Sequence, residues 1–386
     1  MTAPAEGIIC IELTACGGKG AVRIENTRPL AIANRFSGRR PAEVAGLVPL
    51  VFSICRAAQS AACAQAIENA LGEPAGARQK SIRDLLVLAE TAREHALQVL
   101  HSWPRCLHAP EPALASAFMK RLLRLDRELS LCLHDGSDLA RLRHGIAELT
   151  ALLGEAIFGE VPAEWLSRRD MDSLGLWAQR NETLAQTLVE YLVQTGTADA
   201  GASDIAPLPQ LTQEDLQNKL FGENADSFIA RPQWGDLPRE TTPLSRLMNH
   251  RLIESVRDRY GYGLLARLAA CLVELAEIPE RMLSLAGSLA KDDGKVEASA
   301  GQRDHGIGLG FAEAARGRLI HAAEIEGGLV RRYRILAPTE WNFHPEGAAA
   351  RGLASIAAGA PARREALARL FITAVDPCVG YELRLS

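Results

Sequence analysis

The chain has 386 residues, of which 47% are hydrophobic and 23% charged, so it can bury a substantial core in one large domain or a few smaller ones. A net charge of −4 gives no reason to expect a nucleic-acid partner, and no apolar run is long enough for membrane insertion. The start MTAPAEGIICIEL lacks a basic segment followed by an apolar one, so we expect no export signal and a cytoplasmic location. Eight cysteines without a CxxC pair predict free thiols rather than disulfides or a zinc ribbon.

The first thirty residues show the alternation typical of β-strands. Ile9, Ile11 and Leu13 fall on one face, and the stretch GGKG at residues 17–20 is a turn signal. AVRIENTRP then returns the chain along the first strand. We therefore predict an N-terminal β-hairpin within residues 1–30.

Helical patterns dominate from about residue 50. VFSICRAAQSAACAQAIENALG is rich in alanine and ends at Gly72, a residue type common just after helices. SIRDLLVLAETAREHALQVLH follows, with a serine at its start. Residues 138–158 place leucine and isoleucine at the spacing of a core-facing helix. Further helices are expected over about 246–290 and 362–374.

Other segments depart from this helical pattern. Residues 195–245 are dense in Gly, Pro, Asp and Thr, which predicts a loop-rich excursion and leaves a disordered surface loop open. KDDGKVEASAGQRDHGIGLG is expected to be a glycine-bearing loop, and its GIGLGF end lacks the Lys-Ser/Thr pair and the helix of a phosphate-binding loop. GRLIHAAEIEGGLVRRYRILAPT predicts two strands joined at Gly327 and Gly328.

Five stretches, in this order, resemble the large subunit of nickel–iron hydrogenases between residue 50 and the C-terminus. They are SICRAAQSAACAQAIENALG, AREHAL, ETTPLSR, EAARGRLIHAAEIEGGLVRRYRILAPTEWN and DPCVGYELR. The first is similar to the family's Arg-x-Cys-Gly-x-Cys helix, and the last to its terminal Asp-Pro-Cys-x-x-Cys-x-x-His motif. The resemblance implies one domain over residues 1–386 that is mainly α with small β regions: a large-subunit-like helical bundle with β-hairpins near both ends of the chain.

The departures from the family pattern concern its metal ligands. The resemblance maps Cys55 and Cys378 onto the first cysteine of each motif, which in the enzymes are terminal nickel ligands. The two bridging positions are Ala58 and Tyr381, and the position of a cation-binding histidine is Arg384. A methyl group cannot coordinate a metal, and a phenol offers a hard oxygen where a soft sulfur is needed. We therefore expect no stable nickel.

The two remaining sulfurs are suited to one soft metal centre, such as iron carrying carbonyl and cyanide ligands. Because Cys55 begins a helix, we expect the helix dipole to favour its thiolate. Arg316, in EAARG, matches an arginine that lies over the metals in the enzymes, and its guanidinium is suited to donate to cyanide nitrogens. A salt-bridged structural arginine is an equally good interpretation of Arg316.

The whole pattern is similar to hydrogenase accessory proteins of the HupK/HoxV type, which are degenerate relatives of the large subunit. That resemblance implies a non-catalytic scaffold that holds an Fe(CN)2(CO) fragment transiently between Cys55 and Cys378. Its partners would be the hydrogenase large-subunit precursor and the Hyp-type accessory maturation proteins. Two alternatives stay open: a catalytically active, reduced hydrogenase-like redox enzyme, and a metal-free adaptor that recruits maturation proteins.

Other candidate ligands have simpler interpretations. Cys63 lies eight residues after Cys55, roughly 80° around the helix, so we expect it to pack in the core, with a spare thiol for transfer as the alternative. His95 and His321 are expected to satisfy buried hydrogen bonds rather than to bind a metal. For Cys55 and Cys378 themselves, the competing interpretation is a pair of ordinary buried thiols.

Overall fold

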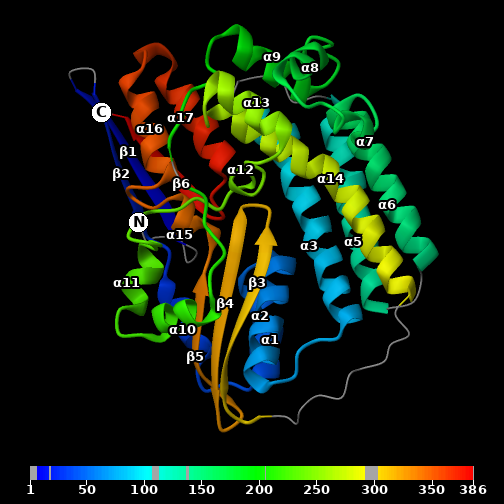
Figure 1. Cartoon of the computed structure of the whole chain (residues 1–386), viewed down its shortest axis with the longest axis vertical. Coiled ribbons are helices and arrows are strands. Elements are labelled where there is room, and N and C mark those ends of the chain that lie inside the picture. The colour runs from blue at the N-terminus through cyan, green and yellow to red at the C-terminus, as the bar shows by residue number, and fades with distance from the viewer. Residues whose placement is uncertain are drawn as a thin grey trace.

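The computed structural model describes residues 7–16, 19–106, 113–135, 139–204, 206–291 and 303–385. Helices make up most of these residues, and two small three-stranded sheets accompany them (Figure 1). This architecture confirms the expected fold class, mainly α with small β regions. The α-helices of the described chain are α1 Pro41–Val51, α2 Arg56–Leu71, α3 Ala77–Leu97, α4 Trp103–Cys106, α5 Ala113–Asp135, α6 Leu139–Leu153, α7 Pro162–Trp165, α8 Met171–Ala178, α9 Leu184–Gln194, α10 Gln213–Phe221, α11 Ala225–Ala230, α12 Pro243–Arg246, α13 Arg251–Tyr260, α14 Leu264–Lys291, α15 Pro338–Asn342, α16 Ala348–Ala358 and α17 Pro361–Val375.

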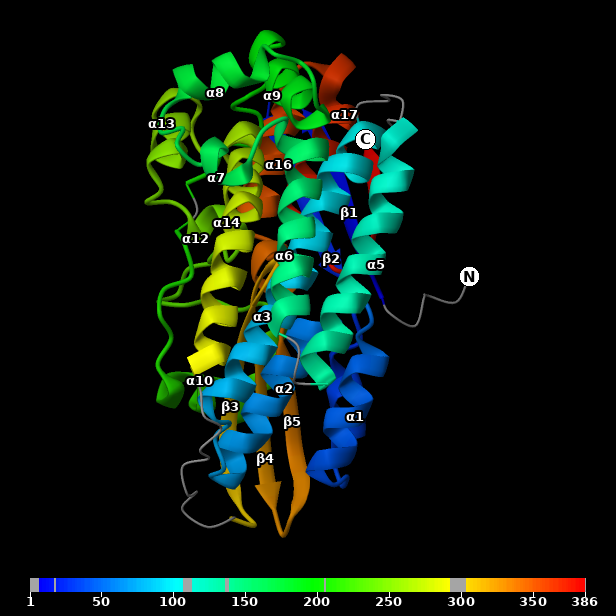
Figure 2. The ribbon, with the colours of Figure 1, turned by 90° about the vertical axis from the view of Figure 1, so that its right-hand side faces the viewer.

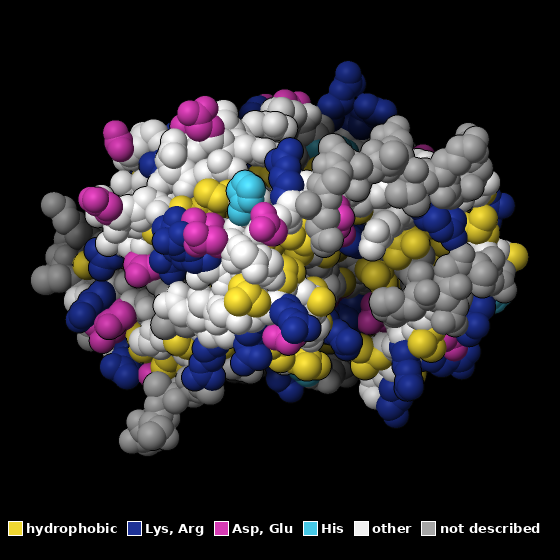
Figure 3. Space-filling model, turned by 90° about the horizontal axis from the view of Figure 1, so that it is seen from below, with side chains coloured by type: hydrophobic (Ala, Val, Ile, Leu, Met, Phe, Trp, Pro, Cys, Tyr) yellow, Lys and Arg dark blue, Asp and Glu magenta, His cyan; other side chains and the backbone are white. Residues whose placement is uncertain are grey.

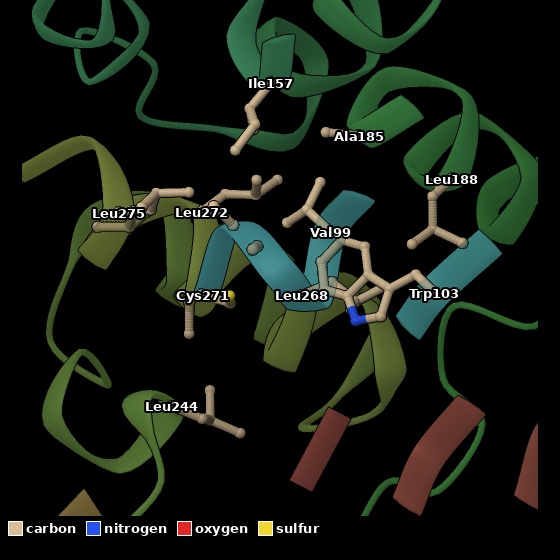
Figure 4. Packing of buried hydrophobic residues seen from close by; sticks show 14 of the residues in the cluster. Val99, Trp103, Ile157, Ala185, Leu188, Leu244, Leu268, Cys271, Leu272 and Leu275 are labelled. Carbon is tan, nitrogen blue, oxygen red and sulfur yellow. The ribbon is translucent and has the colours of Figure 1, made fainter. Parts of the chain in front are cut away.

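The long helices α3, α5, α6 and α14 lie side by side as a bundle along the long axis of the molecule (Figures 1 and 2). The stripe predicted for α6 is buried in this bundle, and a π-helical turn continues the helix to Phe158. Figure 4 shows part of the core, with Leu268 and Leu272 of α14 in one apolar cluster with Val99 and Trp103. The helical pattern predicted over about 246–290 is confirmed as two helices, because Gly261, at φ 68°, ends α13 before α14 begins.

One sheet holds the two ends of the chain together. Its strands, in the order β2-β1-β6, are β1 Ile8–Cys16, β2 Lys19–Asn26 and β6 Gly380–Leu385. β1 and β2 form the antiparallel hairpin that the alternation predicted, with the apolar face of β1 fully buried. The sequence pattern did not predict β6, which pairs in parallel with β1 and places Tyr381 opposite Ile9. The C-terminal segment after Cys378 is therefore held by ladder hydrogen bonds.

The second sheet consists of antiparallel strands β3 Gly306–Ala314, β4 Gly317–Glu326 and β5 Leu329–Leu336. Gly327 and Gly328 form the predicted turn between β4 and β5, both with the positive φ that a two-residue hairpin favours. The expectation of a loop over GIGLG is wrong, because these residues form β3 against α2. A Cβ on Gly308 would lie 2.0 Å from the carbonyl oxygen of Ala66, so glycine is required for this close contact between strand and helix.

The segment 195–245 contains short helices between irregular stretches. Leu216 and Leu220 of α10 and Ile229 of α11 are buried in a cluster with Leu309 of β3 and Trp341 of α15. A wholly disordered surface loop is therefore excluded for this part of the chain. No helix in the described part of the chain is both long and apolar enough to cross a membrane. Figure 3 shows basic and acidic side chains interspersed on the lower face, in line with the small net charge.

Candidate metal centre

Cys55 and Cys378 come from opposite ends of the chain and line the same cavity, of about 270 Å³. Cys55 is the N-cap residue of α2, and Cys378 follows the end of α17 two residues after Asp376, whose backbone is left-handed (φ 59°). Packing of α2 on β3 fixes one cysteine, and pairing of β6 with β1 fixes the other. The cavity is lined by Arg28, Pro29, Ile32, Val51, Phe52, Ser53, Ile54, Cys55, Cys378 and Val379.

Each sulfur accepts one hydrogen bond from a neighbouring polar side chain. The Gln59 amide Nε2 donates to Cys55 Sγ over 3.5 Å, and the Thr339 hydroxyl donates to Cys378 Sγ over 3.0 Å. The backbone N–H of Cys378 also reaches Thr339 Oγ1 at 3.4 Å, so this threonine fixes both the backbone and the side chain of Cys378. These contacts orient the two sulfurs without closing the cavity between them.

The positions that carry bridging cysteines in the hydrogenases contribute nothing to this cavity. Ala58 is fully buried in an apolar cluster, and Tyr381 packs beside Arg369 and Thr373 instead of lining the cavity. Arg384 lies at the surface, where it pairs with Glu12 and Glu382. Within the described residues, no three His, Cys, Asp or Glu side chains gather as a metal-binding group. The donor set is therefore two sulfurs.

The N-terminus of α2 is occupied by a buried carboxylate. Glu90 on α3 accepts hydrogen bonds from the backbone N–H groups of Ala57 at 2.7 Å and Ala58 at 3.1 Å. Burial raises the pKa of Glu90 to about 7, although these two hydrogen bonds and Arg93 act in the opposite direction. The free N–H groups that would favour a Cys55 thiolate are thus already used by another anion.

The predicted lowering of the Cys55 pKa is therefore wrong. Burial, followed by the charges of Cys378 and Glu90, raises the pKa of Cys55 to about 12. The hydrogen bond from Gln59 and the charge of Arg316 oppose this shift but do not overcome it. At neutral pH the unloaded Cys55 is a thiol, and it must lose its proton before its sulfur can serve as a thiolate ligand.

Arg28 is a cavity residue that the sequence analysis missed. It follows the N-terminal hairpin, and its guanidinium pairs with Glu340 at 3.1 Å and lies over the ring of Phe52. Burial disfavours its charge, but Glu340 and the sulfurs of Cys378 and Cys55 outweigh burial and raise the pKa of Arg28. Arg28 therefore provides a fixed positive charge beside both sulfurs.

Arg316 has the carboxylate partners of a structural arginine. It pairs with Glu94 and with Asp376, both at 3.0 Å, and it lines a separate, smaller cavity together with Asp376 and His95. Burial opposes its charge, while the two carboxylates and the sulfurs of Cys378 and Cys55 raise its pKa. Arg316 thus forms the salt bridges of the structural interpretation, and its guanidinium lies near enough to both sulfurs to interact with their charge, so its contact with a cyanide ligand stays a prediction.

The other candidate ligands take the structural roles expected for them. His95 Nε2 lies 2.8 Å from Glu274, and His321 lies 2.8 Å from Gln59 and 2.6 Å from Tyr333. Cys63 is fully buried, and burial raises its pKa to about 11. Neither histidine lines the cysteine cavity.

Four functional neighbours were absent from the sequence prediction: Arg28, Gln59, Glu90 and Thr339. Gln59 had a local signal, since it lies one helical turn after Cys55. Glu90 had a weaker one, as a single carboxylate in the apolar run LLVLAETA. Arg28 and Thr339 had no such signal, because they reach the cavity only through long-range packing.

Comparison with known proteins finds relatives along almost the full length of the chain. The family model for nickel-dependent hydrogenases matches residues 185–379. The hydrogenase expression/formation protein HoxV of Cupriavidus necator is 32% identical over 377 residues, covering 94% of this chain and 92% of that protein. HupV of Azotobacter chroococcum, also a hydrogenase expression/formation protein, is 30% identical and covers 95% of each chain.

A solved structure shows the same fold. The reduced nickel–iron–selenium hydrogenase of Desulfovibrio vulgaris Hildenborough superposes with a TM-score of 0.66 over 94% of each chain, at 15% identity. At that identity the likeness concerns the fold alone, whereas the identity to HoxV and HupV extends along almost the full sequence. The chain belongs to the nickel-dependent hydrogenase family, as a member of its hydrogenase expression/formation proteins of the HupK/HoxV type.

Proposed function

We propose that this protein is a non-catalytic scaffold of nickel–iron hydrogenase maturation, which holds an Fe(CN)2(CO) fragment as cargo between Cys55 and Cys378. The observation that carries the proposal is that both cysteines line one cavity, while the two lost bridging positions, Ala58 and Tyr381, lie outside it. The names of the relatives, hydrogenase expression/formation proteins, support a role in maturation. The proposed recipient is the hydrogenase large-subunit precursor.

The donor set fits a temporary iron site better than a permanent bimetallic one. Two soft sulfurs suit a single soft iron centre, and without bridging thiolates nickel has too few ligands. Because Cys55 is a thiol at neutral pH, binding of the fragment releases a proton, and return of a proton to the sulfur weakens the bond again. A site of this kind loads and unloads reversibly.

The charges around the cavity suit an anionic cargo. Iron(II) with two cyanides and two thiolates carries a net negative charge, and Arg28 lines the cavity with a guanidinium that is mostly shielded from solvent. Its nitrogens are suited to donate to cyanide, with Arg316 as a second cation farther from the cavity. In this proposal, Cys55 and Cys378 bind the iron and Arg28 compensates charge.

Infrared spectroscopy tests the proposal directly. The protein is purified from cells that make the Hyp-type maturation proteins, beside Cys55→Ser, Cys378→Ser and the matched control Cys106→Ser. We expect carbonyl and cyanide stretches in the parent and the control, and their loss in both cavity variants. Absence of these bands from the parent, or their persistence in the Cys55→Ser and Cys378→Ser double variant, would refute the proposal.

Two further measurements separate the competing functions. Hydrogen-dependent dye reduction together with stoichiometric nickel in the purified protein would identify a redox enzyme instead. Full hydrogenase maturation in cells carrying the double cysteine variant would identify a metal-free adaptor. The scaffold proposal predicts neither outcome, and it locates the protein in the cytoplasm with the large-subunit precursor.

A further inference from the structure

Behind Cys55, a chain of hydrogen-bonded, buried polar side chains crosses from α2 into the second sheet. Gln59 lies one turn after Cys55, His321 is on β4, Tyr333 is on β5, and Cys63 lies one turn further along α2. Gln59 Oε1 is 2.8 Å from His321 Nε2, and His321 Nδ1 is 2.6 Å from the Tyr333 hydroxyl. Tyr333 lies in one buried cluster with Cys63. A chain of hydrogen bonds therefore runs from Tyr333 through His321 and Gln59 to the Cys55 sulfur.

The hydrogen bonds that link Tyr333, His321, Gln59 and Cys55 are all donated in one direction. An amide oxygen only accepts, so His321 must donate through Nε2–H. Burial, with the charge of Arg28, lowers the pKa of His321 to about 3, so the ring is neutral and its Nδ1 must accept from Tyr333. The amide nitrogen of Gln59 then faces Cys55 as a donor. Every hydrogen bond from Tyr333 onward is thus donated toward the Cys55 sulfur.

The chain is built from groups that are costly to bury. Gln59 and Tyr333 are each 1% exposed and His321 is 0% exposed, and Tyr333 lies in an apolar cluster with Ala66 of α2 and Ala323 of β4. A buried amide or imidazole without partners costs a few kcal/mol, so each member depends on the next for its hydrogen bond. This dependence fixes the orientation of the Gln59 amide. Without its hydrogen bond to His321, Gln59 could rotate and turn its oxygen toward the Cys55 sulfur.

We infer that Gln59 is a positioning residue for the cargo, held by His321 and Tyr333 so that it donates a hydrogen bond to the Cys55 sulfur while that sulfur binds iron. The inference rests on the proposed function and adds a role for residues outside the cavity. A hydrogen bond to a metal-bound sulfur withdraws electron density from it and so tunes the metal. The iron then donates less electron density to its carbonyl ligand than it would if the Cys55 sulfur accepted no hydrogen bond.

A measurement on the metal-free protein tests the direction of the chain. In protein labelled with ¹⁵N-histidine, we expect His321 to be the Nε2–H tautomer with a bare Nδ1, unchanged from about pH 5 to pH 8. A His321→Gln variant assigns the signal. An Nδ1–H tautomer would overturn the inference, because Gln59 would then have to present its oxygen to Cys55.

A second measurement tests the effect on the cargo. In Gln59→Leu, we expect the carbonyl stretch of the loaded protein to move to lower wavenumber, and a shift of the same sign in Tyr333→Phe. Gln186→Leu replaces an equally buried glutamine that caps α9, and it should leave the band in place while controlling for lost stability. An unchanged band in a folded Gln59→Leu protein would overturn the inference. A parent protein without carbonyl bands would refute the proposed function instead. The His321 tautomer would still show in which direction the hydrogen bonds between His321, Gln59 and Cys55 are donated.

Discussion

The contact between α2 and β3 predicts that Gly310→Ala destabilises the protein and moves Cys55. A Cβ on Gly310 would lie 2.0 Å from the carbonyl oxygen of Ala62 and 2.6 Å from the nitrogen of Ala66. Both neighbours are backbone atoms of α2, so no side-chain rotation relieves the clash. The helix that begins just after Cys55 must move away from the strand as a unit.

The size of the effect follows from this distance. Ordinary contact begins at 3.4 Å, so the Ala62 oxygen must retreat from 2.0 Å by about 1.4 Å. Overpacking in a close-packed core costs about 1–3 kcal/mol, and a clash with backbone belongs at the upper end of that range. A displacement of this size would also break the hydrogen bonds between Glu90 and the first turn of α2.

Urea unfolding followed by circular dichroism measures this cost. We expect Gly310→Ala to lose about 3 kcal/mol of unfolding free energy. The matched control is Gly287→Ala in α14, where a Cβ meets no heavy atom within 4 Å, and it should gain about 0.5–1 kcal/mol. The close-packing argument would be refuted if Gly310→Ala were as stable as the parent. It would also be refuted if Gly287→Ala lost as much unfolding free energy as Gly310→Ala.

Three further predictions concern charge. The pKa of Glu90 is about 7 in the folded protein against 4.5 in the unfolded chain, so the stabilisation that Glu90 contributes falls as the pH rises from 4.5 to 7. We expect the difference in unfolding free energy between the parent and Glu90→Gln to fall by up to about 3 kcal/mol over this interval. Urea unfolding of both proteins at each pH measures this difference. Burial opposes ionisation of Glu274, but Arg246 and His95 outweigh it and lower its pKa to about 2, so its contribution is present above pH 4.5 and is lost in acid. Glu274→Gln should cost about 3–5 kcal/mol at pH 7 and much less near pH 2. Zn²⁺, used as a thiolate-binding probe, should release a proton from Cys55 on binding, with affinity rising about tenfold per pH unit for each proton, as measured by calorimetry in different buffers.

Each of these predictions has a control and a contradicting result. Glu326→Gln alters an exposed ion pair and should show little dependence on pH, so a Glu90→Gln curve parallel to the parent would disprove the raised pKa. For Glu274, equal losses at pH 7 and pH 2 would exclude the charged network. Zinc affinity that is independent of pH, or unchanged in Cys55→Ser, would show that this sulfur does not bind the probe.

Local signals in the sequence predicted local structure well. The alternation of Ile9 and Ile11 predicted the hairpin, Gly72 at φ 73° ends α2 as expected, and Gly327-Gly328 forms the β-turn. Each of these features depends on a few neighbouring residues, and the chemistry of those residues decides it. The motif resemblance added the pairing of Cys55 with Cys378, which no local pattern contains.

The predictions that failed concern contacts between distant segments. The glycines of β3 favour a loop in isolation, and only the approach of α2 explains them as a strand. The pKa of Cys55 depends on Glu90, which lies on another helix. Arg28 enters the cavity from the end of the hairpin, more than twenty residues before the first cysteine of the pair. Long-range placement of this kind is set by the assembled core, so no window of the sequence reveals it.

The parallel pairing of β6 with β1 sets the order in which the cavity can be completed. β1 is synthesised first among the described strands, while Cys378 and β6 follow every other described element. During translation, then, Cys55 is made more than three hundred residues before Cys378, the other cysteine of the cavity. A ribosome-bound chain that lacks β6 has only one of the two cavity cysteines in place, so the proposed two-sulfur site forms only after the last strand has joined β1.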